Sequence, residues 1–292
     1  MDATLKATIL IPAYNEQAVI GRTLQSLTAG MEPGEFQLIV ICNACYDDTA
    51  VAARAACPEA LVLETDTPGK TNAMNMGRGQ AESELIVCLD ADLSVTADHI
   101  RRLIAPLSSG LAHAACGQMN VDLTGCSLPV RMFYSIWMLN PYFSKGKFGG
   151  LFAMSDEGAK RVFPLPEIIA DDEFTSRNFT AAEKAFVQDC QFTVHAPRRV
   201  GDLMKIRRRS LRGTRQISAM GLSVERATGA GSLKQILRRA LVRPVLWPSL
   251  PVYIGLILLI RLQVKFEAAD KAPRWERDDS SRVAPMNSGA GK

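Results

Sequence analysis

Short apolar runs alternate with helical patterns over the first hundred residues. Four runs rich in Ile, Val and Leu, each too short for a typical helix, lie at residues 8–12, 36–42, 61–63 and 85–89. Between them, Ile20, Leu24 and Leu27 have helical spacing, as does the Ala-rich stretch 49–57. The order β-α-β-α-β-α-β predicts an α/β fold with a parallel sheet and helices on both faces.

The run at 85–89 leads directly into Asp90-Ala91-Asp92. Side chains two apart on an extended chain point to the same side, so both carboxylates can face one cation. Hard ions such as Mg²⁺ or Mn²⁺ take oxygen ligands and often keep substrate phosphates in their shell. The alternative is two solvated carboxylates, with Asp92 or Ser94 capping the next helix.

Polar residues follow each of the predicted strands. They are Tyr14, Asn15, Glu16, Asn43, Lys70, Asp90 and Asp92. Ligands of open α/β sheets bind beyond the carboxyl ends of the strands, so we expect these side chains at one edge. A cation, a lysine and helix N-termini there would suit a diphosphate. Neither a Gly-x-Gly-x-x-Gly turn after the first strand nor a P-loop is present, which argues against dinucleotide and P-loop chemistry.

Four segments resemble the motifs of family 2 glycosyltransferases, which have the GT-A fold, in order and spacing. They are 11–16, the turn from Asn43 to Thr49, 69–75 and Asp90-Ala91-Asp92. The resemblance covers residues 6–220 approximately. It implies an inverting transfer of a sugar from a nucleotide diphosphate sugar, assisted by Mg²⁺ or Mn²⁺. The expected fold is a mostly parallel central sheet flanked by helices, with a C-terminal hydrophobic helical segment.

The resemblance also implies which residues contact the nucleoside. Pro12, Tyr14 and Glu16 would line its pocket. Asn43 occupies a position where relatives often carry Asp, so contact between a carboxylate and the base is not expected there. Lys70 would lie by the base or the phosphates.

The resemblance implies that Asp92 binds the metal, with Asp90 beside it on the ribose side of the site. His195, in the predicted strand 192–195, would be a third ligand, since some GT-A enzymes use a downstream His. The alternative for His195 is a structural role in the strand.

Three adjacent acids, Asp171, Asp172 and Glu173, follow an apolar run and open a predicted helix. An inverting displacement needs a carboxylate to take the proton of the acceptor hydroxyl. The family pattern places this base at the second acid, Asp172, with Asp171 as the second choice. The alternative is a favourable negative charge at a helix N-terminus.

The segment 205–216 carries six basic residues. Arginine forks match phosphate oxygens, so the segment can neutralise a leaving diphosphate. Arg209 and Arg212, in an Arg-x-x-Arg-Gly pattern, resemble the arginine segment that closes over the donor in this family. A solvated or membrane-facing basic helix is the alternative. The Gln-x-x-Arg-Trp signature of processive relatives is absent, which favours non-processive transfer.

Composition narrows the class of protein and its compartment. Apolar residues make up 47% of the 292, and a net charge of +4 is too small to indicate a nucleic-acid partner. We interpret the seven cysteines, irregularly spaced, as reduced thiols in a reducing compartment. No charged n-region or apolar h-region opens the chain, so we expect the catalytic part in the cytoplasm.

Residues 244–260 carry no charge and are flanked by arginines. As a helix they would reach about 26 Å, short of a bilayer core of about 30 Å. A short span, an interfacial segment or a helix packed on the domain are all open. We expect membrane association, at the cytoplasmic face of the inner membrane. The expected organisation is a catalytic domain at 1–225, a basic and hydrophobic membrane-associated segment at 226–267 and a flexible tail at 268–292.

Together these patterns predict a metal-dependent inverting glycosyltransferase of envelope or polysaccharide biosynthesis. Its donor would be a nucleotide diphosphate sugar, with a UDP-sugar favoured, and its acceptor a saccharide or a lipid-linked molecule. One alternative is a sugar-nucleotide nucleotidyltransferase, but that class needs a Gly-rich basic loop after its first strand, which 12–16 is not. The other is a nucleotide-sugar-binding protein without catalytic activity.

Overall fold

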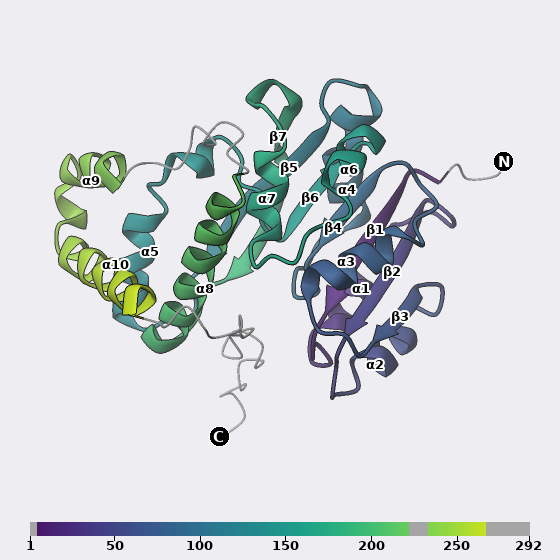
Figure 1. The fold of residues 1–292 in the computed structure, drawn as a ribbon, viewed down its shortest axis with the longest axis horizontal. Helices are drawn as coiled ribbons and strands as arrows, with labels where there is room; N and C mark the ends of the chain where they lie inside the picture. Colours follow the sequence, from purple (N-terminus) through teal and green to yellow (C-terminus); the bar gives the residue numbers. More distant parts are fainter. Residues whose placement is uncertain (1–4, 222–232, 267–292) are drawn as a thin grey trace, which may run out of the picture.

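The computed structural model describes residues 5–221 and 233–266. Within them, seven strands form one sheet in the order β3-β2-β1-β4-β6-β5-β7 (Figure 1). The bounds are Ala7–Ala13 for β1, Phe36–Asn43 for β2, Leu61–Thr65 for β3, Ile86–Leu89 for β4, Ala114–Asp122 for β5, Leu151–Met154 for β6 and Lys184–His195 for β7. β6 is antiparallel to β4 and β5, and the other pairs are parallel. The predicted mostly parallel sheet is confirmed.

Helices from the first half of the chain pack on both faces of this sheet. They are α1 (Ile20–Thr28), α2 (Thr49–Ala56), α3 (Lys70–Arg78) and α4 (Ala97–Ser108). Alternation along β1 explains the two faces, because Ile9 packs in one core with α1, α2 and α4 while Leu10 packs in another with α3. A Cβ at Gly77 of α3 would lie 2.8 Å from Ile41 Cδ1, so only glycine lets α3 lie this close to β2.

The second half adds five helical elements before the C-terminal layer. They are α5 (Leu128–Trp137), the 3₁₀ turn Pro141–Ser144, α6 (Asp156–Val162), α7 (Asp171–Arg177) and the 3₁₀ turn Ala181–Glu183. β7 is twelve residues long, whereas the sequence predicted only its last four. Its alternating exposed and buried positions are typical of a strand at the edge of a sheet.

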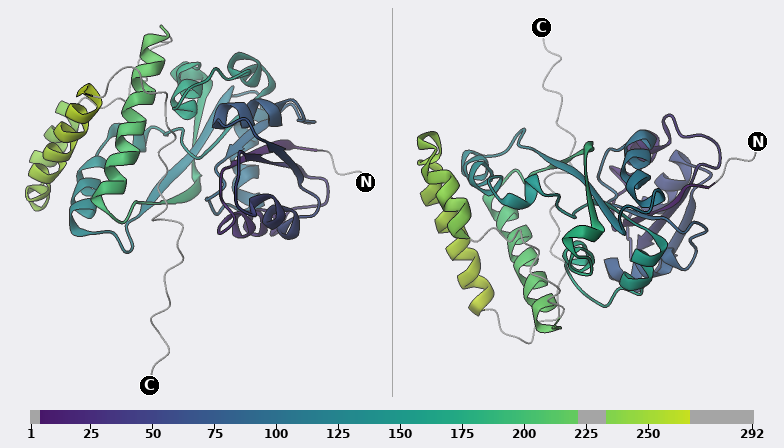
Figure 2. Two further views of the ribbon diagram at one scale, coloured as in Figure 1. Left: turned by 60° about the horizontal axis from the view of Figure 1, so that its bottom comes forward. Right: turned by 90° about the horizontal axis from the view of Figure 1, so that it is seen from above.

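The C-terminal layer consists of α8 (Val200–Ala219), α9 (Leu233–Leu241), the 3₁₀ turn Pro244–Leu246 and α10 (Ser249–Phe266). Figure 2 shows α8 and α10 side by side at one end of the molecule, and α10 also contacts α5. The apolar segment predicted at 244–260 is thus shifted: Pro244 and Pro248 precede α10, and the helix runs on through Arg261 and Lys265. The predicted tail at 268–292 lies outside the described residues, as does the boundary at 225.

Candidate active site

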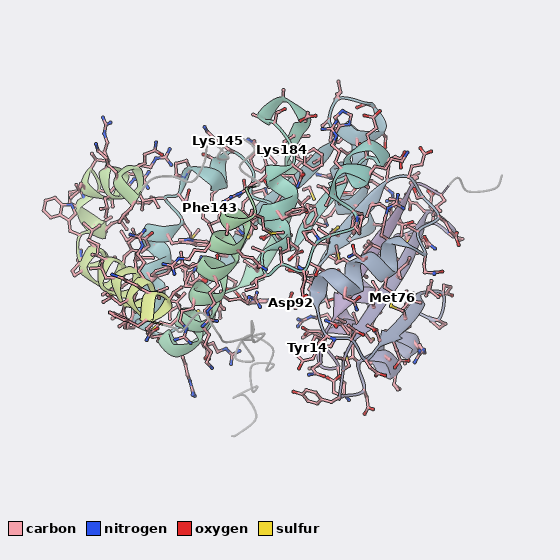
Figure 3. The ribbon with its side chains drawn as sticks, viewed as in Figure 1. Tyr14, Met76, Asp92, Phe143, Lys145 and Lys184 are labelled. Carbon is pink, nitrogen blue, oxygen red and sulfur yellow. The ribbon has the colours of Figure 1, made fainter. Side chains whose placement is uncertain are left out.

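The candidate site begins at the carboxyl end of β4, where Asp90 and Asp92 follow the strand. β1 and β4 are parallel neighbours, so Tyr14 and Asp92 lie at the same edge of the sheet (Figure 3). Helix α4 is capped by Thr96, whose backbone N–H donates to His99 Nδ1 at 3.1 Å. The N-cap of α4 is therefore Thr96 and neither Asp92 nor Ser94.

Loops after β1 and β2 are hydrogen-bonded to each other on the expected nucleoside side. Asn15, which has a positive φ of 53°, accepts a hydrogen bond from the Tyr46 backbone through Oδ1 at 2.9 Å. The backbone N–H of Glu16 donates to Thr49 Oγ1 at 2.8 Å. The two loops thus form one wall that carries both Tyr14 and Glu16 at the sheet edge.

Asn43 and Pro12 complete this wall from the strands themselves. Asn43 is buried at the end of β2, and its Oδ1 accepts a hydrogen bond from the Gly69 backbone at 2.9 Å. Pro12 pairs in register with Ile41 near the end of β1. Asn43 therefore fixes the turn that precedes Lys70, a role that follows from structure and that the sequence did not predict.

Lys70, the first residue of α3, joins two carboxylates that are distant in the sequence. Its Nζ lies 2.8 Å from Asp90 Oδ1 and 3.0 Å from Asp171 Oδ2. Burial alone would lower the pKa of the Lys70 ammonium, but the charges of Asp171 and Asp90 outweigh it and raise that pKa above its ordinary value. The predicted lysine, strand-end acid and helix-opening acid thus meet at one place.

Asp171 and Asp172 open α7, as predicted, but have different surroundings. The Asp171 side chain is 7% exposed and engages Lys70, whereas that of Asp172 is 30% exposed and lies 3.7 Å from Lys147 Nζ. Burial raises the pKa of Asp171, and the charges of Asp172 and Asp90 add to this effect, while Lys70 opposes it. Of the two acids, Asp172 is the one that solvent or an acceptor can reach.

A Gly149-Gly150 turn lies against the two acid-bearing segments. Gly150 has a φ of 75° and its carbonyl accepts a hydrogen bond from the Asp90 backbone N–H at 2.7 Å. An added Cβ would lie 3.3 Å from Asp90 Oδ2 at Gly150 and 3.4 Å from Asp172 Oδ2 at Gly149. Sequence reasoning assigned no role to Lys147, although its position two residues before this turn was the available signal.

Helix α8 contacts the segment that leads into Asp171. A Cβ at Gly213 would lie 2.7 Å from Ala170 Cβ, so glycine permits this approach. Thr214 Oγ1 donates a hydrogen bond to Glu173 Oε2 at 2.6 Å, which ties α8 to α7. The predicted Arg209 and Arg212 lie on this helix, and their contact with a diphosphate stays a prediction.

His195 at the end of β7 has a carboxylate neighbour on the adjacent strand. Its Nδ1 lies 3.1 Å from Asp122 Oδ2, and the two residues are partners in the β5–β7 register. In the described part of the chain, no three His, Cys, Asp or Glu side chains are arranged to hold a metal. The structure therefore does not gather His195 with Asp90 and Asp92, and its role as a ligand stays a prediction.

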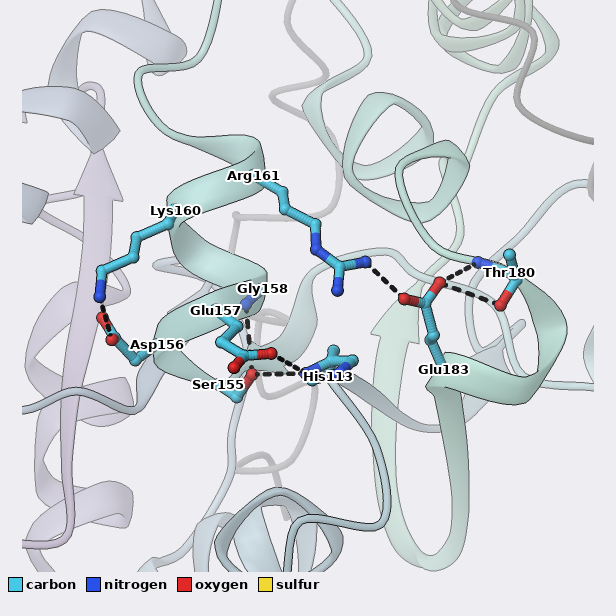
Figure 4. A network of polar contacts seen from close by, with 9 residues as sticks. All are labelled: His113, Ser155, Asp156, Glu157, Gly158, Lys160, Arg161, Thr180 and Glu183. Atoms are coloured by element: carbon cyan, nitrogen blue, oxygen red, sulfur yellow. Dashed lines mark hydrogen bonds and ion pairs between the residues drawn. The ribbon is translucent and has the colours of Figure 1, made fainter.

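A second polar network lies at the other end of β6, around α6 (Figure 4). Arg161 pairs with Glu183, and Thr180 donates to the other oxygen of that carboxylate. The hydrogen bond from Arg161 is the main reason why the pKa of Glu183 falls to about 2. Ser155 caps α6 and lies 3.3 Å from His113 Nδ1. These contacts hold α6 and β7 in place.

Solved structures similar to this chain have the same fold. A mannosyltransferase, PcManGT, from Pyrobaculum calidifontis in complex with GDP-Man and Mn²⁺ matches with a TM-score of 0.59 and 20% identity over 89% of this chain and 77% of that one. Glucosyl-3-phosphoglycerate synthase from Mycobacterium tuberculosis, in complex with Mn²⁺, UDP-Glc and phosphoglyceric acid, matches with a TM-score of 0.54 and 20% identity over 72% and 79%. The GT-A fold expected from the sequence is confirmed.

Curated relatives match less than half of this chain. The undecaprenyl-phosphate 4-deoxy-4-formamido-L-arabinose transferase of an Enterobacter species is 29% identical over 38% of this chain and 36% of its own length. The succinoglycan biosynthesis protein ExoO of Rhizobium meliloti is 31% identical over 46% and 38%. The chain thus spans well under half of each of these relatives. The family model described as glycosyl transferase family 2 matches residues 8–155, which is half of the chain, so the chain belongs to glycosyl transferase family 2.

Proposed function

We propose that this protein transfers one sugar, with inversion, from a nucleotide diphosphate sugar to a saccharide or lipid-linked acceptor at a membrane surface. The observation that carries the proposal is the position of Lys70 between Asp90 and Asp171. Lys70 thereby joins the carboxyl end of β4 to the first residues of α3 and α7, at the sheet edge where α/β folds bind ligands. The partly exposed Asp172 follows directly in the chain.

A divalent cation, Mg²⁺ or Mn²⁺, fits the carboxylates present. Asp90 and Asp92 would hold it, and two protein carboxylates suffice when phosphate oxygens complete the shell. The glycine at position 150 leaves room beside Asp90 Oδ2, where a Cβ would lie only 3.3 Å away. When bound, the cation would neutralise charge on the donor diphosphate.

The other roles in the proposed reaction belong to side chains of the protein. Pro12, Tyr14, Glu16 and Asn43 are placed on the wall that would hold the nucleoside. Lys70 supplies a fixed positive charge, and Arg209 and Arg212 would neutralise the leaving diphosphate. Asp172 would take the proton of the acceptor hydroxyl as its oxygen attacks the anomeric carbon from the face opposite the diphosphate. UDP is the nucleotide we favour, while the similar structures hold either UDP-Glc or GDP-Man.

The outer face of α10 supports membrane association. Its buried residues, Ser249, Tyr253, Ile260 and Val264, form one stripe. Its exposed apolar residues form another, at Ile254, Leu258, Leu259, Leu262 and Phe266. Among the described residues, α10 alone is long and apolar enough to cross a membrane. An exposed apolar stripe opposite a packed one is typical of a helix that lies along a bilayer surface.

Basic residues beside α10 favour this interfacial position over a span. Arg208 donates to Gln263 Oε1 at 2.9 Å, and Arg215 donates to the Val264 carbonyl at 3.2 Å. If α10 crossed the bilayer, these guanidinium groups on α8 would enter it, which is costly. With α10 flat, the arginines of α8 and α9 can face anionic headgroups of the cytoplasmic leaflet.

Binding to nucleotide sugars tests the enzymatic proposal. UDP-, GDP- and dTDP-sugars are added with Mg²⁺ or Mn²⁺, and the unfolding temperature is measured. A ligand at one hundred times its Kd adds about 2.7 kcal/mol, enough for a clear rise. D92N should lose the metal-dependent part of this rise, whereas D98N, an exposed acid on α4, should keep it. If no nucleotide sugar raises the unfolding temperature with either metal, the proposal fails.

Two further assays separate the alternatives. A nucleotidyltransferase would release pyrophosphate from a nucleoside triphosphate and a sugar phosphate, whereas the proposed enzyme would not. A binding protein without catalytic activity would be stabilised by the donor but would neither transfer nor hydrolyse it.

Sedimentation with vesicles tests the membrane proposal. The protein should pellet with phosphatidylglycerol vesicles and less with phosphatidylcholine vesicles. L258E combined with L262E should abolish pelleting, whereas L111E, which alters a more exposed leucine before β5, should not change it. Wild-type pelleting of the double variant would contradict the proposal.

A further inference from the structure

Cys42 and Cys45 lie at the wall that carries the predicted nucleoside contacts. Cys42 is buried and is the last residue but one of β2, and Cys45 follows in the loop, partly exposed. Between them, Ala44 has a positive φ of 48°, which turns the chain, and Cys42 lies in the same hydrophobic core against which Cys45 packs. The sequence interpretation of seven unremarkable thiols overlooked this Cys-x-x-Cys spacing.

The loops after β1 contact Cys45 directly. Its Sγ accepts a hydrogen bond from the Asn15 backbone N–H at 3.3 Å and donates one to the Ala13 carbonyl oxygen at 3.4 Å. Asn43, which fixes the turn before Lys70, stands between the two cysteines in sequence. Any movement of the Cys45 sulfur is therefore passed to both sides of the wall.

The environment makes Cys45 the more reactive thiol. The hydrogen bond from Cys42 is the main reason why the pKa of Cys45 falls to about 6, with the Asn15 N–H acting in the same direction and burial and Asp47 against it. The hydrogen bond with Cys45 and burial raise the pKa of Cys42. A partly exposed thiolate beside a buried thiol is the usual arrangement of an attacking and a resolving cysteine.

We propose that Cys42 and Cys45 form a reversible disulfide that distorts the nucleoside wall and weakens donor binding. The oxidant is hydrogen peroxide. The Cys45 thiolate attacks one peroxide oxygen, the O–O bond breaks, and hydroxide leaves as Cys45 becomes a sulfenic acid. The Cys42 sulfur then attacks the Cys45 sulfur, and the sulfenic hydroxyl leaves as water with the Cys42 proton. Two thiols are oxidised by two electrons and one peroxide is reduced to two waters.

Closing the bond has a direct structural consequence. The two sulfur atoms must approach each other to about 2.0 Å. Because Cys42 is held in the sheet, Cys45 makes most of this movement and leaves the Asn15 N–H. The segment carrying Tyr14 and Glu16 then loses an anchor. The effect on donor binding rests on the proposed function, but formation of the disulfide does not.

Peptide mapping after treatment with hydrogen peroxide tests the chemistry. We expect a Cys42–Cys45 linked peptide that has lost two hydrogens, that disappears with dithiothreitol, and that forms before Cys57 or Cys126 reacts. C45S should prevent it, whereas C126S, which replaces another partly buried cysteine, should not. If no linked peptide forms, or if Cys126 reacts first, the inference is overturned.

UDP binding, measured by calorimetry on the same samples, tests the consequence. Affinity should fall about tenfold on oxidation, or about 1.4 kcal/mol, and recover with dithiothreitol. C45S should bind UDP equally well before and after peroxide. Unchanged affinity in fully linked wild-type protein would overturn the coupling to the wall. If the reduced protein does not bind UDP, the titration is repeated with GDP and dTDP. If it binds none of the three, the proposed function fails, and peptide mapping still decides whether the cysteine pair exists.

Discussion

Two buried carboxylates in this molecule, Glu35 and Asp171, have opposite electrostatic surroundings. Glu35 has two cations of its own, with Arg101 at 2.6 Å and Lys6 at 2.9 Å. The hydrogen bond from Arg101 is the main reason why its pKa falls to about 2. Asp171 shares the single ammonium of Lys70 with Asp90, and its burial raises its pKa.

The difference indicates what each cluster is for. Around Glu35 two cations outnumber the one buried carboxylate, and the cluster joins the loop before β2 to α4. Around Asp171, Lys70 faces Asp90 and Asp171, and Lys147 lies 3.7 Å from Asp172, so three carboxylates face two lysines. A structural ion pair gains nothing from such an excess of negative charge. A site that is to receive a cation and to keep one carboxylate available for a proton requires it.

The largest expected effect in this comparison is at Asp172. D172N removes the proposed base without changing shape, so sugar transfer should fall by about 10²–10⁴-fold. Donor affinity, measured by calorimetry, should stay near the wild-type value, since Asp172 does not contact the buried lysine. D189N, which alters an acid of β7 outside the site, is the matched control. Full transfer activity in D172N would remove Asp172 from the base role.

The next effect is at Lys70. K70M leaves Asp90 and Asp171 facing each other, and breaking a buried pair in this way costs about 3–5 kcal/mol of unfolding free energy. The double variant K70M/D171N removes the buried charge as well and should recover most of that loss in a denaturant titration. If K70M alone is as stable as wild type, the lysine does not hold the cluster together.

Much of this cluster could be predicted from the sequence, and part of it could not. The sequence marks clearly the strand that Asp90 follows and the helices that begin near Lys70 and Asp172. The position of these three residues at one edge of the sheet could therefore be predicted. The pairing of Lys70 with Asp171 was not, because β6 enters the sheet antiparallel between β4 and β5 and brings α7 back to the site. No local pattern encodes that insertion.

The same limit applies elsewhere in the chain. His195 has the appearance of a free strand-end ligand in the sequence, but the β5–β7 register places Asp122 beside it. The apolar segment near the C-terminus was recognised from its composition. Its helix start at Ser249 and its packing on α5 depend on prolines and on distant partners, which local composition does not resolve.

The pH dependence of stability should have opposite signs at the two carboxylates. The lowered pKa of Glu35 contributes stability that is present above its unfolded value of 4.5 and is lost as the pH falls toward 2. E35Q should therefore lose up to about 3 kcal/mol at pH 7 and little near pH 2. The raised pKa of Asp171 favours its protonated form, so stability is lost as the pH rises through it. The free energy of unfolding of D171N, relative to that of wild type, should therefore increase as the pH rises. The same pH dependence in E35Q and D171N would contradict this comparison.

The smallest expected effect is at the network around α6, where Arg161 and Glu183 are both partly exposed. Exposed pairs contribute about 0.2–1 kcal/mol, because water and salt screen them and ordering two long side chains costs entropy. R161A should therefore shift the unfolding free energy by no more than this and should leave sugar transfer unchanged, since its contacts hold α6 and β7 far from Lys70. Denaturant titrations at low and high salt should show the small difference shrinking as salt rises. A large loss of activity in R161A would mean that the two polar networks are coupled through β6, and the separation drawn between a structural and a functional cluster would then be wrong.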